Sequence, residues 1–336
     1  MLNIDLKLFK KNHKKSKNQV LYHAIKSNGL KEIENLINNF LNVRNSFVFE
    51  SVEKGKIKGR YTIFGKNPDK IWEFNNKSSY LIKNNKKIKI NEDPKFLIEK
   101  IIESFKFKIP SNLPPIASII SGYFSYDSIR YIEKIPNNCE DDLNIPDVRL
   151  MRPRTLIIYD NLKKKIFYII NVFQDEKISN YQKKYLEINT ELFQHFNKSF
   201  SQSLKKKKSS KSKKIVVKSN TAKKKFLKMV EKAKKYIKLG DIFQVVLSQR
   251  FEAKLTKSPL EIYKKLRITN PSPFMFYFNF KDFQIIGASP EILVRLRDNK
   301  ITVRPIAGTR PRGKTLTQDK FYERDVLKDK KELSEH

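Results

Sequence analysis

Two glutamates near the end of the chain have a spacing that suits a metal ion. Glu332 and Glu335 are three residues apart, so their carboxylates would share one face of a helix. Mg²⁺ binds through oxygen and keeps several water ligands, so such a pair could hold it. A solvated, charged helix would carry the same pair without any function, and the spacing alone does not separate the two interpretations.

A second candidate site is the stretch RPIAGTRPRG, residues 304–313. Gly308 would let a ligand approach the backbone closely. Thr309 offers a hydroxyl group, and Arg310 and Arg312 are cations that could attract a carboxylate. A polar strand end with surface arginines would have the same composition, so the chemistry alone leaves both interpretations open.

Gln244 is a polar residue in the run FQVVLSQRF, residues 243–251, which predicts a strand. If its amide is buried it needs hydrogen-bond partners, whereas at a sheet edge it would not. The segments FES (49–51) and NPSPFMF (270–276) indicate a strand end and a proline turn. Nothing in the sequence resembles a P-loop, a dinucleotide-binding fingerprint or a Ser/Cys–His nucleophile.

Composition limits the class of protein that must position these residues. The 336 residues are 39% hydrophobic and include 24 Phe and 14 Tyr, enough for a sizeable core in about two domains. No apolar run reaches the roughly 18 residues of a membrane span, and the N-terminus lacks the order of a signal peptide. The single cysteine, Cys139, allows no internal disulfide. We therefore expect a cytoplasmic protein without a membrane partner.

The net charge of +36 has two explanations. A basic surface can neutralise nucleic-acid phosphates, but sequence-specific readers of bases rely on Arg. Here the excess is Lys, spread over the whole length of a chain rich in Asn and Ile, which points to A+T-rich codons. We therefore favour compositional drift and expect no nucleic-acid partner.

One segment interrupts the globular pattern. Residues 199–214, SFSQSLKKKKSSKSKK, have no apolar periodicity, and their like charges repel one another. The sequence therefore predicts an N-terminal domain over 1–198, a linker over 199–214, and a second domain over 215–336.

The hydrophobic spacing predicts helices and strands on both sides of this linker. Helices are expected at 31–41, 94–105, 176–196 and 222–239, the last ending at Gly240. Strands are expected at 46–51, 80–90 with a break at Asn84-Asn85, 154–172 as a hairpin, 243–251, 274–280, 283–288, and 291–306 as a hairpin around Asp298-Asn299. Because strands mostly follow strands, we expect an α+β fold with largely antiparallel sheets packed against helices.

In this order and spacing, the segments resemble anthranilate synthase component I, a family of chorismate-utilising enzymes. The resemblance covers most of residues 47–336 but not the first stretch of the chain or the lysine-rich linker. It is carried by the runs FESVEKGKIKGRYTIFG, SGYFSYDSIRYIE, GDIFQVVLSQRF, NPSPFMFYF, GASPEILVR, RPIAGTRPRG and KELSEH. The resemblance implies the fold of the chorismate-utilising enzymes.

It also implies a lyase reaction that begins tryptophan biosynthesis. Chorismate binds with Mg²⁺, ammonia adds to the ring, the ring hydroxyl leaves, and pyruvate is eliminated to give anthranilate. The ammonia of the family comes from glutamine through a separate amidotransferase subunit, component II. No amidotransferase-like cysteine nucleophile is visible in this sequence, so that partner would be another chain.

The family's functional residues map onto positions already noted. Glu335 matches a direct Mg²⁺ ligand and Glu332 its acidic neighbour, while Gly308 and Thr309 match a turn that contacts the substrate. Gln244 and Thr309 are the catalytic candidates. Five further positions match the site of feedback inhibition by tryptophan, namely Glu50, Ser51, Pro273, Phe274 and Met275.

Two positions discriminate among the chorismate enzymes. Aminodeoxychorismate synthases carry a nucleophilic Lys where Ala307 stands, and isochorismate and salicylate synthases carry a general-base Lys where Gln244 stands. Ala307 therefore argues against an aminodeoxychorismate synthase, and the neutral amide of Gln244 favours ammonia over water as the nucleophile. The family continues beyond the position that matches His336 with a second acidic pair and further substrate-binding residues. We therefore expect a fragment lacking part of the active site; the alternatives are an inactive remnant that at most binds tryptophan or the partner, and an aminodeoxychorismate synthase.

Overall fold

The computed structural model describes residues 2–27, 29–53, 56–57, 59–76, 78–105, 107–200, 215–280, 282–305 and 308–335. Its packing forms two compact units, one of residues 1–203 with 263–336 and the other of residues 204–262. Most of the expected linker, residues 201–214, lies outside the described residues, so the domain boundaries placed there stay a prediction.

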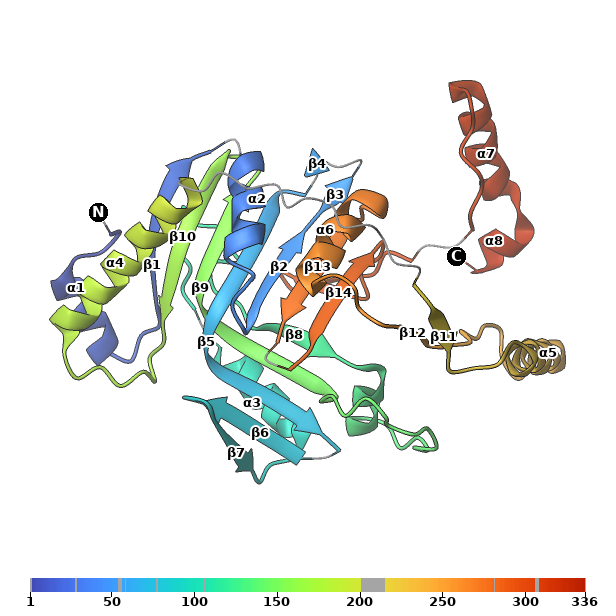
Figure 1. Ribbon diagram of the computed structural model, residues 1–336, viewed down its shortest axis with the longest axis horizontal. Coiled ribbons are helices and arrows are strands. Elements are labelled where there is room, and N and C mark those ends of the chain that lie inside the picture. The colour runs from blue at the N-terminus through green and yellow to red at the C-terminus, as the bar shows by residue number, and fades with distance from the viewer. Residues whose placement is uncertain are drawn as a thin grey trace. The chain divides into compact units, whose positions relative to one another are not determined.

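The first unit is built on a ten-stranded sheet (Figure 1). Its neighbouring strands pair antiparallel, which confirms the α+β prediction. The central order is β1 (Gln19–Lys26), β10 (Lys165–Val172), β9 (Val148–Asp160), β5 (Tyr61–Asn75), β2 (Ser46–Glu50), β13 (Phe274–Asn279) and β14 (Gln284–Ser289). Beside this path, β6 (Ser78–Lys83) joins β5 and β7 (Lys86–Ile90), and β8 (Ser121–Phe124) joins β9.

Both hairpins expected in the N-terminal part are confirmed. Strands β9 and β10 meet around Asp160, whose Oδ1 accepts hydrogen bonds from the backbone N–H groups of Leu162 and Lys163, each at 3.0 Å. Strands β6 and β7 turn at Asn84 and Asn85, which have φ angles of 51° and 61°. Asn adopts this left-handed region more readily than most residues, which is why the pair forms a tight turn.

Strand β5 was not expected from the sequence. Its fifteen residues include Asn67 and Pro68, which are typical of a turn. The structure instead continues the strand through an irregularity between Pro68 and Lys70 while it pairs with β9 on both sides. A bulge of this kind lets a strand absorb a proline without ending.

Several helices of the first unit pack on one another and against strands of the sheet. Helices α1 (Leu6–Lys14), α2 (Leu30–Asn39) and α4 (Tyr181–Phe200) pack together, with α4 against β10 and α1 against β1. Helix α3 (Pro94–Ser104) begins with the expected proline, capped by Asp93, and packs beside β6. Its Leu97 and Ile101 are buried, whereas Phe96 and Ile102 are exposed.

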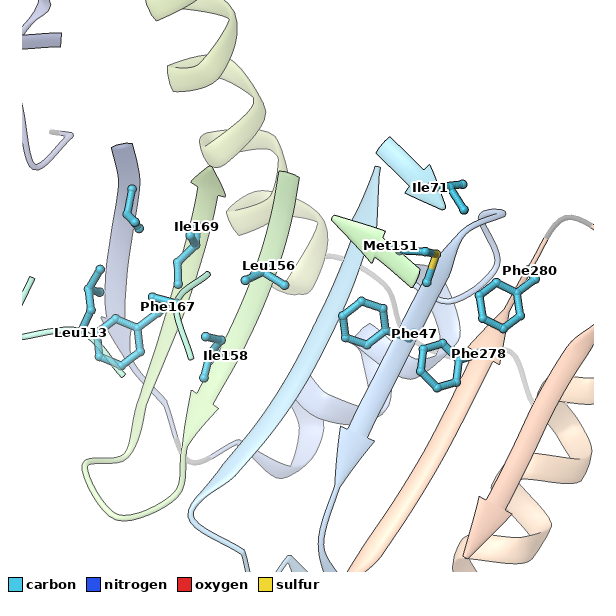
Figure 2. Packing of buried hydrophobic residues seen from close by; sticks show 12 residues of the cluster. Phe47, Ile71, Leu113, Met151, Leu156, Ile158, Phe167, Ile169, Phe278 and Phe280 are labelled. Carbon is cyan, nitrogen blue, oxygen red and sulfur yellow. The ribbon is translucent and has the colours of Figure 1, made fainter. Parts of the chain in front are cut away.

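The main hydrophobic core lies against the sheet (Figure 2). Phe47 of β2 is fully buried, with its ring centroid 5.7 Å from that of Phe278 on β13. Phe278 in turn stacks on Phe280 at 5.2 Å. Phe276, Phe278 and Phe280 therefore join the N-terminal strands in one core, although the lysine-rich segment separates them in sequence.

The second unit contains β11 (Val217–Ser219), α5 (Lys223–Leu239) and β12 (Phe251–Ala253). Helix α5 ends as expected at Gly240, whose φ of 78° is left-handed. The strand expected over 243–251 is wrong except at Phe251, because residues 243–250 have no regular strand structure. An apolar run becomes a strand only beside a hydrogen-bonding neighbour, and in the described part of this unit β12 alone pairs with β11.

The remaining elements belong to the first unit or cross into it. The hairpin expected over 291–306 is confirmed but shorter, with β15 (Arg295–Arg297) and β16 (Lys300–Thr302) around a turn at Asp298-Asn299. The others are β3 (Val52–Glu53), β4 (Lys56–Ile57), the 3₁₀ helix η1 (Tyr126–Tyr131), α6 (Pro259–Thr269), α7 (Leu316–Lys328) and α8 (Lys330–Glu335). In the described residues, no helix is long and apolar enough to cross a membrane.

Candidate functional site

A cavity of about 460 Å³ opens where β2 ends and β13 begins. Its volume is in the range of about 300–1,000 Å³ that is typical of small-molecule sites. All five positions that match the tryptophan site line it: Glu50, Ser51, Pro273, Phe274 and Met275. The structure thus brings together two short segments that are more than two hundred residues apart in sequence.

Sheet pairing creates this meeting point. Met275 of β13 lies opposite Glu50 of β2 in the antiparallel register. Beyond the strand ends, the backbone N–H of Val52 donates a hydrogen bond of 3.0 Å to the carbonyl oxygen of Ser272. The two walls of the cavity are therefore fixed by backbone hydrogen bonds rather than by side chains alone.

The rest of the cavity lining is mainly apolar and aromatic. It comprises Phe49, Arg60, Tyr61, Gly122, Tyr123, Phe276, Phe278 and Ile285. Burial raises the pKa of Tyr123 far above its ordinary value, although Arg149 opposes the shift. Its hydroxyl therefore stays protonated and donates a 2.6 Å hydrogen bond to the carbonyl oxygen of Pro146. The cavity suits a ligand with a large apolar or aromatic body.

A cation lies among the lining residues. The Arg60 guanidinium pairs with the buried carboxylate of Asp160, with Nη2 at 3.2 Å from Oδ2. This hydrogen bond raises the pKa of Arg60 above its ordinary value. Arg60 therefore remains charged, and its side chain is 45% exposed.

The Glu50 carboxylate is buried and held from α6. Arg267 donates a hydrogen bond of 2.9 Å from Nη2 to Oε2, and the Tyr263 hydroxyl donates to Oε1. Burial raises the pKa of Tyr263 well above its usual value, and the nearby Glu50 charge adds to this shift. Burial would lower the pKa of Arg267, but the Glu50 carboxylate outweighs it and the pKa is raised. Tyr263 therefore stays protonated and Arg267 stays charged, and both donate hydrogen bonds to the Glu50 side chain.

The second set of candidates meets at the other end of the chain. Gly308 lies directly against α8, and a Cβ added at Gly308 would overlap the carboxylate of Glu332. Thr309 follows with an exposed side chain. Glu335 lies on α8, but its side chain, like Ala307, lies outside the described residues. The predicted turn and the first predicted acidic residue are therefore in contact.

The neighbouring arginines are engaged within the chain. Arg310 pairs with Asp325 of α7 at 2.6 Å and with Asp329 at 2.7 Å, and Arg312 pairs with Asp319 at 2.9 Å. The hydrogen bond from Arg310 lowers the pKa of Asp329 below its ordinary value. Both cations pair with carboxylates on or just after α7, although Arg312 stays 92% exposed, and attraction of a substrate carboxylate stays a prediction.

Binding of Mg²⁺ at this end of the chain depends on which side chains there can donate oxygen ligands. Within the described ranges, no group of three or more acidic, His or Cys side chains is placed to hold a metal ion. Glu332 supplies one carboxylate of the kind that Mg²⁺ takes, and its Oε1 lies 3.9 Å from Nη1 of Arg310. Among the described side chains, one predicted magnesium ligand is therefore present.

Gln244 differs from its prediction. It is exposed and lies in the irregular 243–250 segment of the second unit, not on a strand and not in a core. The apolar run around it predicted a strand and left open whether Gln244 is buried or at a sheet edge, because periodicity reports only which side chains need cover. It does not report whether a neighbouring element supplies that cover.

Sequence reasoning missed two residues beside the cavity, Tyr263 and Arg267. They are four residues apart, so they share one face of α6. That spacing was a usable signal, since an arginine in line with an aromatic residue on a half-buried helix needs an acidic partner.

Comparison with known proteins identifies the class. Residues 53–336 match the model of the chorismate binding enzyme family, and the chain belongs to this family. Within it, the chain is similar to proteins named anthranilate synthase component 1. The protein of that name from Cereibacter sphaeroides is 36% identical over 338 residues, which cover 98% of this chain and 67% of that protein. The Acetivibrio thermocellus protein is 39% identical over 301 residues, covering 86% of this chain and 60% of that one.

A solved structure agrees with the sequence relatives. Anthranilate synthase component I from Streptococcus pneumoniae matches with a TM-score of 0.68 and 32% identity, covering 84% of this chain and 60% of that one. These matches confirm the family resemblance and the fold class. The chain spans 60% to 67% of the length of these relatives.

Proposed function

We propose that this chain belongs to the large subunit of an anthranilate synthase. The reaction converts chorismate and ammonia to anthranilate, pyruvate and water. A separate glutamine amidotransferase subunit, component II, supplies the ammonia. The observation that carries the proposal is the family match over residues 53–336, together with the contact between Gly308 and Glu332.

The residues have distinct parts in this proposal. Gly308 leaves room for the substrate because it has no side chain, and Thr309 donates or accepts a hydrogen bond beside it. Glu332 and Glu335 would hold Mg²⁺, which neutralises the ring carboxylate and the charge that develops as the hydroxyl leaves. Gln244 carries a neutral amide that cannot act as a general base, which favours ammonia over water as the nucleophile.

The test uses the full-length protein with chorismate, ammonium and Mg²⁺, and follows the fluorescence of anthranilate. Glu332→Gln is expected to lower kcat/KM at least about 100-fold, the scale seen when a charge-stabilising group is removed. Lys331→Gln, the exposed neighbour on α8, serves as the control and is expected to stay near wild type. Aminodeoxychorismate, isochorismate or salicylate as the product would contradict the proposal.

We also propose that the cavity at Glu50 and Ser51 is a feedback site for tryptophan. The supporting observation is that all five matched positions line one mainly apolar cavity. Since every lining residue is in this chain, titration calorimetry on the 336-residue chain can test binding directly. Phe274→Ala and Ser51→Ala are expected to weaken binding of L-tryptophan, whereas the exposed Ser111→Ala should not. Equal affinity for chorismate and tryptophan at this site would contradict the assignment.

The feedback site leads to a second candidate function, a catalytically inactive protein that binds tryptophan. The two candidates differ in the intact mass of the native protein. A native mass near the 39.8 kDa of this chain, with tryptophan binding and no anthranilate formed, would favour the inactive binding protein. A heavier native protein with turnover would favour the enzyme.

A further inference from the structure

The cavity depends on a small buried group behind it, which we define as the Glu50 latch: Glu50, Tyr263 and Arg267. Glu50 is the last residue of β2, and its side chain is fully buried. Tyr263 and Arg267 lie one turn apart on α6 and both bond to its carboxylate. Glu50 lines the cavity, but Tyr263 and Arg267 are not among its described lining residues.

The latch connects the two walls of the cavity. One wall continues from Glu50 directly into Ser51. The other begins shortly after α6, which ends at Thr269, four residues before Pro273. Tyr263 also packs on Tyr277 of β13, with ring centroids 5.5 Å apart. The same helix therefore contacts β2 through an ion pair and β13 through an aromatic ring.

The physical chemistry of such a group favours a fixed geometry. A buried carboxylate that loses its cation is costly and must move, recruit water or bind a proton. A fully satisfied buried network, by contrast, holds one arrangement of the elements that carry it. Movement of Glu50 would shift Ser51 and the end of β2, and so would change the shape of the cavity.

We infer that Tyr263 and Arg267 are positioning residues for the effector cavity. They act through Glu50 to hold Ser51 and the Pro273–Met275 segment at the separation that accepts an amino acid. In the same way, a ligand that displaces Glu50 shifts α6. This shift couples ligand binding at the cavity to the rest of the chain. This inference rests on the proposed tryptophan site and adds residues that do not touch the ligand.

The experiment measures the affinity of the 336-residue chain for L-tryptophan by titration calorimetry. Arg267→Met is expected to raise Kd at least tenfold, because it leaves the Glu50 charge unpaired. Tyr263→Phe removes one hydroxyl, and we expect a rise of about threefold to tenfold, in line with the loss of one hydrogen bond to a charged group. Lys265→Met, on the exposed side of the same helix, is the matched control and should stay within twofold of wild type.

Three more variants separate positioning from loss of fold. Arg267→Lys keeps the charge and should recover part of the affinity lost in Arg267→Met. The double variant Glu50→Gln/Arg267→Gln removes both charges and should bind better than Arg267→Gln alone, since no buried charge is left unpaired. A purely structural defect would show no such recovery, and circular dichroism of each variant records whether it is folded.

The outcomes separate the positioning role of Tyr263 and Arg267 from the proposed tryptophan site. If the wild-type chain binds tryptophan and both Arg267→Met and Tyr263→Phe bind equally well, the positioning role is overturned and the effector site stands. If the double variant binds no better than Arg267→Gln, Arg267 does not act through Glu50 and the positioning role is overturned. If the wild-type chain binds no tryptophan, the proposed effector site is wrong and the positioning role is overturned with it.

Discussion

The sheet of the first unit and the helices α5 and α7 all carry apolar residues, but these residues are packed very differently. Along β9 and β10, all but a few side chains are buried. In α5 and α7, by contrast, none of the residues is buried, and Leu316 at the start of α7 is 84% exposed. Apolar residues in the sequence are therefore enough to predict a helix or strand, but their burial also requires a neighbouring helix or strand that packs against them. The cavity at Glu50 and Ser51 lies in the well-packed region, whereas the Gly308–Glu332 contact lies in the exposed one.

This contrast predicts the largest effect in the core. Phe47→Ala removes a fully buried ring and should lower the free energy of unfolding by about 3–5 kcal/mol. Phe243→Ala, in the second unit, removes a ring that is 94% exposed and should change it by less than about 0.5 kcal/mol. Guanidinium titrations followed by far-UV circular dichroism measure both. Similar losses of unfolding free energy in the two variants would contradict the conclusion that the sheet region is better packed than the second unit.

The next effect is on activity rather than stability. Gly308→Ala would push the Glu332 carboxylate away from the turn, because the new methyl group overlaps it. In the full-length enzyme we expect kcat/KM to fall about 10–100-fold, or about 1.4–2.7 kcal/mol of transition-state stabilisation. The unfolding midpoint should hardly move, since a glutamate side chain can swing aside. Wild-type activity in this variant would show that the contact is not part of the active site.

A smaller effect is expected at the start of α7. The Thr315 hydroxyl caps this helix by accepting a 3.2 Å hydrogen bond from the backbone N–H of Gln318. Thr315→Ala should destabilise the helix by about 1 kcal/mol, whereas Thr317→Ala, inside the same helix, keeps the cap. Hydrogen exchange at α7 amides should rise in the first variant and not in the second. Equal exchange in both would mean that the cap does not limit the stability of α7.

The smallest effect is a pH dependence in the sheet region. Burial would raise the pKa of Asp175, but hydrogen bonds and charge from Lys70 and Arg152 outweigh it, so the pKa is lowered. The pairing therefore stabilises the fold above the ordinary pKa of 3.8 and is lost as the pH falls through the folded value below it. Asp175→Asn should cost less than about 1 kcal/mol at pH 6, because the exposed part of the pair is screened. The difference from wild type should vanish near pH 2; a constant difference would exclude this pairing as its cause.

Local sequence signals predicted the elements that are stabilised locally. Pro94 at the start of α3, Gly240 at the end of α5 and Asn84-Asn85 between β6 and β7 were all found where expected. Strand β5 was missed because its Asn67-Pro68 pair has the composition of a turn, and only the long pairing with β9 overrides it. The prediction of a strand over residues 243–251 was wrong for the opposite reason. These residues have a high strand propensity, but among the described residues no strand pairs with residues 243–250.

The candidate site residues show the same difference between features that local sequence patterns predict and features that depend on distant parts of the chain. The cavity residues were found through matched motifs, and their meeting follows from the register of β2 with β13, which no local pattern reveals. The Arg310 and Arg312 charges were recognised, but their partners on and just after α7 depend on how the chain folds back. Tyr263 and Arg267 were missed because their importance comes from Glu50, which lies 213 residues from Tyr263.

Helix α6 has a consequence for how this protein could tolerate changes in length. Its first residues, 259–262, cluster with the second unit and the rest with the first. An α-helix turns about 100° per residue, so one residue inserted between Tyr263 and Arg267 would carry one of them away from Glu50. The part of α6 between Tyr263 and Arg267 therefore has a fixed register, and insertions or breakpoints for circular permutation within it should be rejected.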